Sequence, residues 1–361
     1  MRKNLFATTP GIIIVGAVIG LIAVWLQKLG NPANMGICVA CFERDVAGGL
    51  GLHRAAIVQY LRPEIMGLVL GSLAAAIATR EFKPRGGSAP IVRFVLGMIA
   101  AMGALVFLGC PWRAILRLAG GDGNAILGLA GLATGIWFGT LFFKKGYSLG
   151  RSNSQSVVSG ALFPVIAVCL LLLYLIFPQI PDQPQSGPLF YSVKGPGSQH
   201  APFIASLGLA FIIGIFAQRS RFCTMGAFRD LFLFRYTHLF LGLAAMFAAA
   251  FIANALTGGL KFGFEGQPVA HSDFLWNYLG MVTAGLAFAL AGGCPGRQLF
   301  MAGEGDSDAG SFALGMLVGA AMAHNLGTAS SGTGIGVYGM QATILGFAVC
   351  LIIGFVHSKK A

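Results

Sequence analysis

Long apolar runs, separated by short glycine-rich or polar segments, make up most of this chain. A helix needs roughly 17–25 predominantly apolar residues to cross the hydrocarbon core of a membrane. Ten runs meet or approach this length, near 11–27, 60–79, 91–108, 124–143, 157–178, 201–217, 238–256, 274–292, 309–326 and 336–356. The pattern predicts an all-α polytopic membrane protein with about ten membrane-spanning helices.

Composition agrees with this class and excludes others. Of the 361 residues, 56% are hydrophobic and 10% are charged, whereas soluble domains are about a quarter charged. The formal net charge of +12 does not indicate a nucleic-acid partner, because the basic residues are scattered and form no recognition motif. Seven cysteines, an odd number lying mostly in or beside apolar segments, argue against a disulfide framework. We expect no metal site and no cofactor.

The basic residues between the runs indicate how the chain is oriented. Lys and Arg concentrate in cytoplasmic loops of membrane proteins. If both termini are cytoplasmic, every basic cluster falls on that side: Arg2 and Lys3; Arg80, Lys83, Arg85 and Arg93; Lys144, Lys145 and Arg151; Arg219, Arg221, Arg229 and Arg235; Lys359 and Lys360. We predict an N-terminal part at 1–178, an external Pro/Gly-rich linker at 179–200, and a C-terminal part at 201–361.

Four shorter segments are too polar for ordinary spans, and each contains cysteine and arginine. They lie at 36–51, 110–123, 221–235 and 294–306. Such segments are tolerated at membrane depth only where they are buried in protein or line a wet cavity. We predict that they form re-entrant loops or half-helices.

The four segments repeat in pairs. Cys38, Arg44 and Asp45 recur 185 positions later as Cys223, Arg229 and Asp230, and Cys110, Pro111, Arg113 and Asp122 recur 184 positions later as Cys294, Pro295, Arg297 and Asp306. Five spans per repeat is an odd number, which gives the two halves opposite orientations. Many transporters have this inverted-repeat plan, with a site near the bilayer midplane.

The repeated arginines, Arg44, Arg113, Arg229 and Arg297, suit an anion. Half-helices starting at Pro111 and Pro295 would add oriented N–H groups. We expect the aspartates of the repeats to orient and partly neutralise these arginines: Asp45, Asp122, Asp230 and Asp306. Two simpler interpretations stay open, since Arg113 and Arg297 could snorkel to lipid head groups and the other two could merely pair with adjacent carboxylates.

The cysteines narrow the choice of passenger. Cys169 and Cys350 lie within runs and suit packing. Four others lead the four segments, namely Cys38, Cys110, Cys223 and Cys294, and Cys41 is an additional thiol in the first. A thiol is a weak donor that would hold a terminal sulfur or selenium atom loosely, and a thiolate would accept that atom covalently. Both mechanisms stay open. Cys38 and Cys41 have a CxxC spacing, but Gly226 stands at the counterpart of Cys41.

These residues favour a transporter, not an enzyme, for a small sulfur- or selenium-containing anion that passes along a central relay of thiols. One alternative is a membrane thiol oxidoreductase, or a sulfur or selenium transferase, that uses Cys38, Cys41 and the other loop cysteines. Another is a permease for hard oxyanions in which the thiols only pack. Competition by sulfate as strong as by thiosulfate would favour that second alternative.

Several stretches also carry a family resemblance: NMGICVACFERDVAGGLGLHRAAIVQYLRPEI (34–65), RGGSAP (85–90), YSLGR (147–151) and the paired Cys-Pro-x-Arg segments. In these the chain resembles the YeeE/YedE family, and within it the YedE branch linked to selenium metabolism. The resemblance implies an hourglass-shaped transporter of the bacterial inner membrane that takes up thiosulfate. It implies relay thiols at Cys38, Cys110 and Cys294, with Cys223 opening the remaining loop. It also implies a cytoplasmic partner, a small sulfur-carrier protein resembling TusA or SirA.

Overall fold

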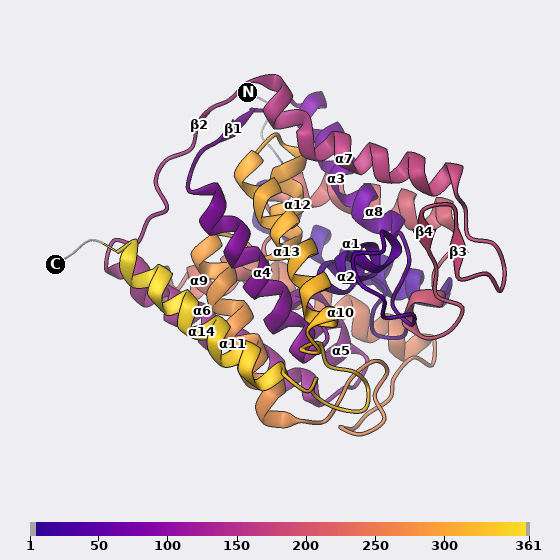
Figure 1. The fold of residues 1–361 in the computed structure, drawn as a ribbon. Coiled ribbons are helices and arrows are strands. Elements are labelled where there is room, and N and C mark those ends of the chain that lie inside the picture. Colours follow the sequence, from indigo (N-terminus) through magenta and orange to yellow (C-terminus); the bar gives the residue numbers. More distant parts are fainter. Residues whose placement is uncertain (1–4, 359–361) are drawn as a thin grey trace.

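The chain folds into a bundle of helices joined by loops in a computed structural model that describes residues 5–358 (Figure 1). The α-helices are α1 (Thr9–Lys28), α2 (Val39–Gly49), α3 (Pro63–Ala78), α4 (Pro90–Phe107), α5 (Pro111–Ala119), α6 (Asn124–Lys144), α7 (Val157–Ile176), α8 (Phe203–Ser220), α9 (Thr224–Phe234), α10 (His238–Leu256), α11 (Phe274–Ala291), α12 (Pro295–Gly303), α13 (Ser307–Asn325) and α14 (Gly339–Val356). The other elements are η1 (Leu5–Ala7), η2 (Pro196–Ser198), β1 (Arg85–Gly86), β2 (Asn153–Ser154), β3 (Gln185–Ser186) and β4 (Leu189–Phe190). β1 pairs antiparallel with β2, and β3 with β4.

All ten predicted runs form helices. Within residues 5–358, eight stretches of helix are long and apolar enough to cross a membrane. The first helix of each stretch is α1, α4, α6, α7, α8, α10, α11 or α14. This confirms an all-α polytopic membrane protein. The number is eight and not ten because α3 has only 16 residues and because α13 carries Asp308 in its first turn and His324 in its last. The basic residues at the chain ends, Arg2, Lys3, Lys359 and Lys360, lie outside the described residues.

The four cysteine-led segments form the short helices α2, α5, α9 and α12, and each helix begins directly after a cysteine. Cys38 and Cys223 are extended residues at the N-caps of α2 and α9. Pro111 and Pro295 occupy the first turn of α5 and α12, where a helix has no use for a backbone N–H. The sequence therefore fixes where each short helix starts.

Helices from the two halves of the chain pack on one another in crossed pairs. α1 packs along α10 and α3 along α8, while α4 packs along α13 and α6 along α11. Glycines permit the close approach: a Cβ atom added to Gly16 of α1 would lie 1.9 Å from the Gly242 carbonyl oxygen in α10, and one added to Gly71 of α3 would lie 2.0 Å from that of Phe211 in α8. Such small-residue contacts are typical of membrane helix bundles.

Two pairs of loops are joined in a matching way. The backbone N–H of Lys83 donates to the carbonyl oxygen of Glu304 at 3.0 Å, and that of Lys261 donates to the carbonyl oxygen of Gly120 at 2.8 Å. The loop after α3 therefore holds the end of α12, and the loop after α10 holds the end of α5.

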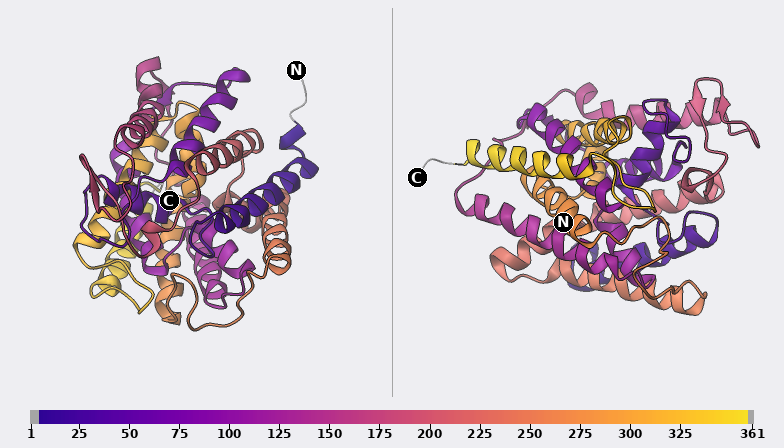
Figure 2. Two further views of the ribbon diagram at one scale, coloured as in Figure 1. Left: turned by 90° about the vertical axis from the view of Figure 1, so that its right-hand side faces the viewer. Right: turned by 60° about the horizontal axis from the view of Figure 1, so that its bottom comes forward.

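The linker between the halves lies beside α2. The backbone N–H of Ser192 donates to the carbonyl oxygen of Gln59 at 2.8 Å, and the Ser192 hydroxyl accepts the Gln59 N–H at the same distance. Figures 1 and 2 place the β3–β4 hairpin of this linker and the C-terminal end of α14 at opposite sides of the molecule.

Candidate transport site

Three cysteines from the first half form one group, which we call the N-terminal thiol cluster: Cys38, Cys41 and Cys110. The Cys38 sulfur accepts the backbone N–H of Cys41 at 3.4 Å, and its thiol interacts with the thiols of Cys41 and Cys110. All three side chains are at most 1% exposed. Residues that lie 72 positions apart in the chain, Cys38 and Cys110, therefore meet in the protein interior.

Cys223 and Cys294 form the corresponding C-terminal thiol cluster. The Cys223 sulfur accepts the backbone N–H of Gly226 at 3.3 Å, and the two thiols interact with each other. Cys223 is 6% exposed and Cys294 is fully buried. The structure thus brings the four repeated cysteines together as two pairs, one in each half of the chain.

In each cluster, one sulfur atom lies where two helix N-termini meet. The backbone N–H groups of Ala40 in α2 and Arg113 in α5 face the Cys110 sulfur, and those of Thr224 in α9 and Arg297 in α12 face the Cys294 sulfur. The N-terminus of a helix carries partial positive charge and free N–H groups, which favour an anion. Both clusters therefore combine thiols with a positive electrostatic potential from the backbone.

Arg113, which we expected to attract an anion, is fully buried and bound on several sides. Its guanidinium donates to the Val269 carbonyl oxygen at 3.0 Å, to the Asn34 carbonyl oxygen at 3.3 Å and to the Leu108 carbonyl oxygen. It also approaches the Cys41 sulfur at 3.6 Å. Arg113 therefore acts first as a structural anchor for the N-terminal thiol cluster.

Arg297, the counterpart of Arg113, is held more loosely. Its guanidinium donates to a Glu304 carboxylate oxygen at 3.3 Å, and its side chain is 14% exposed. Glu304 also binds Arg221 at 2.7 Å and Arg85 at 3.5 Å. Three arginines thus share one buried carboxylate at the C-terminal end of α12, the helix that begins after Cys294.

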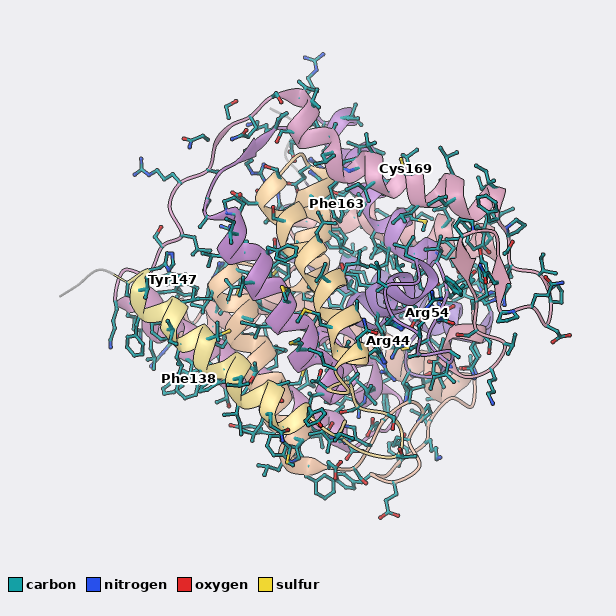
Figure 3. All side chains as sticks on the ribbon, viewed as in Figure 1. Arg44, Arg54, Phe138, Tyr147, Phe163 and Cys169 are labelled. Carbon is teal, nitrogen blue, oxygen red and sulfur yellow. The ribbon has the colours of Figure 1, made fainter. Side chains whose placement is uncertain are left out.

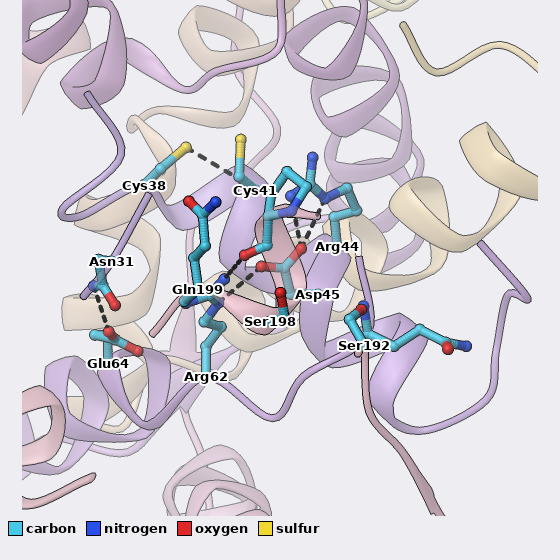
Figure 4. A network of polar contacts seen from close by, with 12 residues as sticks. Asn31, Cys38, Cys41, Arg44, Asp45, Arg62, Glu64, Ser192, Ser198 and Gln199 are labelled. Carbon is cyan, nitrogen blue, oxygen red and sulfur yellow. Dashed lines mark hydrogen bonds and ion pairs between the residues drawn. The ribbon is translucent and has the colours of Figure 1, made fainter. Parts of the chain in front are cut away.

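Arg44 pairs with Asp45 as the sequence predicted, but a second arginine joins them (Figure 4). Asp45 accepts from Arg44 at 2.7 Å and from Arg62 at 2.8 Å, with all three side chains at most 2% exposed. Arg62 in turn donates to the linker carbonyl oxygens of Pro196 at 2.8 Å and Gln199 at 2.9 Å. Sequence reasoning missed Arg62 because it precedes Pro63, outside the repeated segments.

The matching pair in the second half, Arg229 and Asp230, is more accessible. The two charged groups lie 2.8 Å apart, with side chains 35% and 16% exposed. Adjacent Arg-Asp residues therefore pair in both halves, but only the first pair lies deep in the protein.

Asp122 and Asp306 do not bind the arginines that we expected. Asp122 accepts from Arg117 at 2.6 Å, and both side chains are fully buried. Asp306 accepts from Arg85 at 2.8 Å and caps α13 by accepting the Ala309 N–H at 3.0 Å. The prediction that they neutralise Arg113 and Arg297 is wrong, because the loops that follow α5 and α12 turn these carboxylates toward other partners.

The remaining cysteines and histidines lie away from the two clusters or within packing contacts. All seven cysteines are free, so Cys38 and Cys41 are not bridged. Cys350 is buried, whereas Cys169 is exposed on α7 (Figure 3). The rings of His53 and His324 pack with their centroids 4.5 Å apart and their planes tilted by 30°.

Comparison with known proteins bears mainly on the second half. Residues 219–355 match the family model described as Sulphur transport, and this stretch contains Cys223, Arg229, Cys294 and Arg297. A stretch of 97 residues is 32% identical to the thiosulfate transporter TsuA of Spirochaeta thermophila. The matched stretch covers 27% of this chain and only 29% of that relative.

The fold defines a helical polytopic membrane protein, and its residues 219–355 are similar to the sulphur transport family. The resemblance to the YeeE/YedE family noted in the sequence agrees with both matches.

Proposed function

We propose that this protein is a transporter for a small sulfur- or selenium-containing anion such as thiosulfate. The observation that carries the proposal is the pair of thiol clusters, in each of which two helix N-termini point backbone N–H groups at one cysteine sulfur. An anion with a terminal sulfur or selenium atom suits both properties, because the N–H groups attract its charge and the thiols contact its soft atom weakly enough to release it. Transport by the matched relative supports the same class of passenger.

The membrane arrangement is part of the proposal. The two halves, 1–178 and 201–361, would be inverted repeats whose short helices are re-entrant, in a bacterial inner membrane with both termini cytoplasmic. The crossed packing of α1 on α10 and α8 on α3 supports this arrangement, because exchanging the two halves turns one contact into the other. The matched loop contacts Lys83–Glu304 and Lys261–Gly120 support it in the same way.

In this arrangement the C-terminal thiol cluster lies nearer the cytoplasm and would deliver the passenger there. A small sulfur-carrier protein resembling TusA or SirA would receive it. The exposed arginines Arg221 and Arg229, with side chains 45% and 35% exposed, support an acceptor that carries negative charge.

Uptake of radiolabelled thiosulfate into proteoliposomes tests the proposal. Cys110→Ala and Cys294→Ala should each lower uptake by about tenfold or more, the size expected when a passenger loses a well-placed buried partner. Cys169→Ala is the matched control, because this cysteine is exposed on α7. Unchanged uptake in both cluster variants would contradict the thiol relay. A persulfide or disulfide that cycles with substrate in the absence of net uptake would instead favour the membrane thiol enzyme.

A further inference from the structure

One aromatic side chain joins the two thiol clusters. Trp112 follows Cys110 by two positions in α5 and is 1% exposed. Its ring centroid lies 5.8 Å from that of Phe222, which precedes Cys223, and 5.9 Å from that of Phe300 in α12. The indole of the first half therefore packs among residues of the second half, next to the C-terminal thiol cluster.

The residue at the equivalent position of the second half is a glycine. Gly296 lies 184 positions after Trp112, the same offset that relates Cys110 to Cys294. A Cβ atom added to Gly296 would lie 3.1 Å from the six-membered ring of Trp112. Trp112 and Gly296 thus occupy equivalent positions in the two halves and contact each other. The large indole fits because glycine has no side chain. The indole of Trp112 therefore occupies the space that a side chain at position 296 would need.

The indole N–H of Trp112 is buried and has no hydrogen-bond partner. Buried tryptophan N–H groups usually find a partner, and leaving one unpaired costs about 1–3 kcal/mol. The hydroxyl of Thr224, next to Cys223, is also buried without a partner. Its counterpart 185 positions earlier is Val39, which has no hydroxyl. Two donors near the junction of the clusters are therefore available to a passenger.

We propose that Trp112 is the specificity-determining partition between the two thiol clusters. Its ring closes the way between Cys110 and Cys294 in the absence of passenger, and its N–H donates a hydrogen bond to the anion as the anion moves from one cluster to the other. This role rests on the proposed transport function. It assigns the discrimination between thiosulfate and sulfate to Trp112, a residue outside the repeated Cys-Arg pattern.

Uptake measurements separate the two parts of this role. Trp112→Phe keeps an aromatic ring and removes the N–H, and should lower thiosulfate uptake by about tenfold, the effect of one lost hydrogen bond to a charged group. Trp137→Phe, at a side chain that is 45% exposed on α6, is the matched control and should leave uptake unchanged. Trp112→Ala removes the ring and should raise the uptake of sulfate above that of wild type. Equal uptake by Trp112→Phe and Trp137→Phe would overturn the donor role.

Thiol labelling tests the partition without any transport. A small charged methanethiosulfonate reagent is added to one side of sealed vesicles, and labelled cysteines are identified by mass spectrometry. In wild type, labelling from the side of Cys38 should stop at the N-terminal thiol cluster, whereas in Trp112→Ala it should extend to Cys294. Identical labelling in the two proteins would overturn the partition. If the labelling differs as expected but wild type takes up no thiosulfate, the proposed function fails and the partition stands.

Discussion

Around Cys110, the nearest arginine donates to backbone carbonyl oxygens on several sides and is fully buried. Around Cys294, the corresponding arginine donates to one carboxylate at 3.3 Å and is 14% exposed. The short helices differ in the same sense, since all 11 residues of α2 are buried but in α9 only Thr224–Ala227 are. Two clusters with the same backbone plan thus have different surroundings.

The difference teaches how an internally repeated protein can perform two tasks. Cations in the N-terminal cluster have fixed partners, so they set the shape of the site and cannot change partners without a large cost. Three arginines at the C-terminal end of α12 share Glu304, and under the proposed function they would exchange it for an arriving anion. We expect substitutions in the first set to affect stability, and those in the second set to affect transport.

The largest expected effect comes from replacing each of the two equivalent arginines, Arg113 and Arg297, by glutamine. Arg113→Gln leaves several buried carbonyl oxygens unpaired, and should lower the free energy of unfolding by about 3–5 kcal/mol. Arg297→Gln removes one partly exposed contact and should change it by about 1 kcal/mol or less, while lowering thiosulfate uptake. Thermal unfolding in detergent checks both. Equal destabilisation by the two variants would break the comparison.

A smaller difference is expected for the two equivalent aspartates. Asp122→Asn weakens a contact to Arg117 in which both side chains are fully buried, so the expected loss of stability is about 2–3 kcal/mol. Asp306→Asn weakens a contact to Arg85, whose side chain is 29% exposed, and the expected loss is about 1 kcal/mol. Chemical denaturation of the two variants should preserve this order. The reverse order would mean that exposure does not govern these pairs.

The smallest expected effect concerns the linker over the N-terminal cluster. His200 stacks on Tyr60 with ring centroids 4.3 Å apart, and its Nε2–H donates to the Gln179 side-chain oxygen at 2.8 Å. Burial, and then the charge of Arg62, lower the pKa of His200 below its usual 6.5. The folded linker therefore disfavours the protonated ring, and its stability should fall as pH drops below about 6.5.

Hydrogen-exchange protection of the Gly197 amide checks this pH dependence. Protection should decrease between pH 7 and pH 5.5 in wild type but not in His200→Gln. The loop 79–89, which contains no histidine, should keep its protection over the same range. Loss of protection in both segments would attribute the effect to global unfolding.

The long apolar runs and the repeated motifs could be predicted from the sequence. Apolar runs predicted the helices because a backbone in lipid must satisfy its own hydrogen bonds. Cys-Pro predicted the start of α5 and α12, because proline suits the first helical turn. The Arg44–Asp45 and Arg229–Asp230 pairs were also expected, since adjacent residues need no knowledge of the fold.

Contacts without a counterpart in the other half were missed. Arg117 binds Asp122, but Met301 stands at the position equivalent to Arg117. Trp112 was missed in the same way, because the equivalent position in the second half is Gly296. Arg62 depends on the linker, whose path over α2 no local pattern encodes. A search for repetition finds what the halves share and overlooks the residues in which they differ.

The central claim is that the two thiol clusters are successive binding sites for one soft anion on its way through the protein. A structure determined with bound thiosulfate tests it most directly. We predict anion density beside the Cys110 or Cys294 sulfur, within hydrogen-bonding distance of the backbone N–H groups of Arg113 or Arg297. Density at a site remote from both clusters, with the clusters unchanged from the ligand-free protein, would contradict the claim.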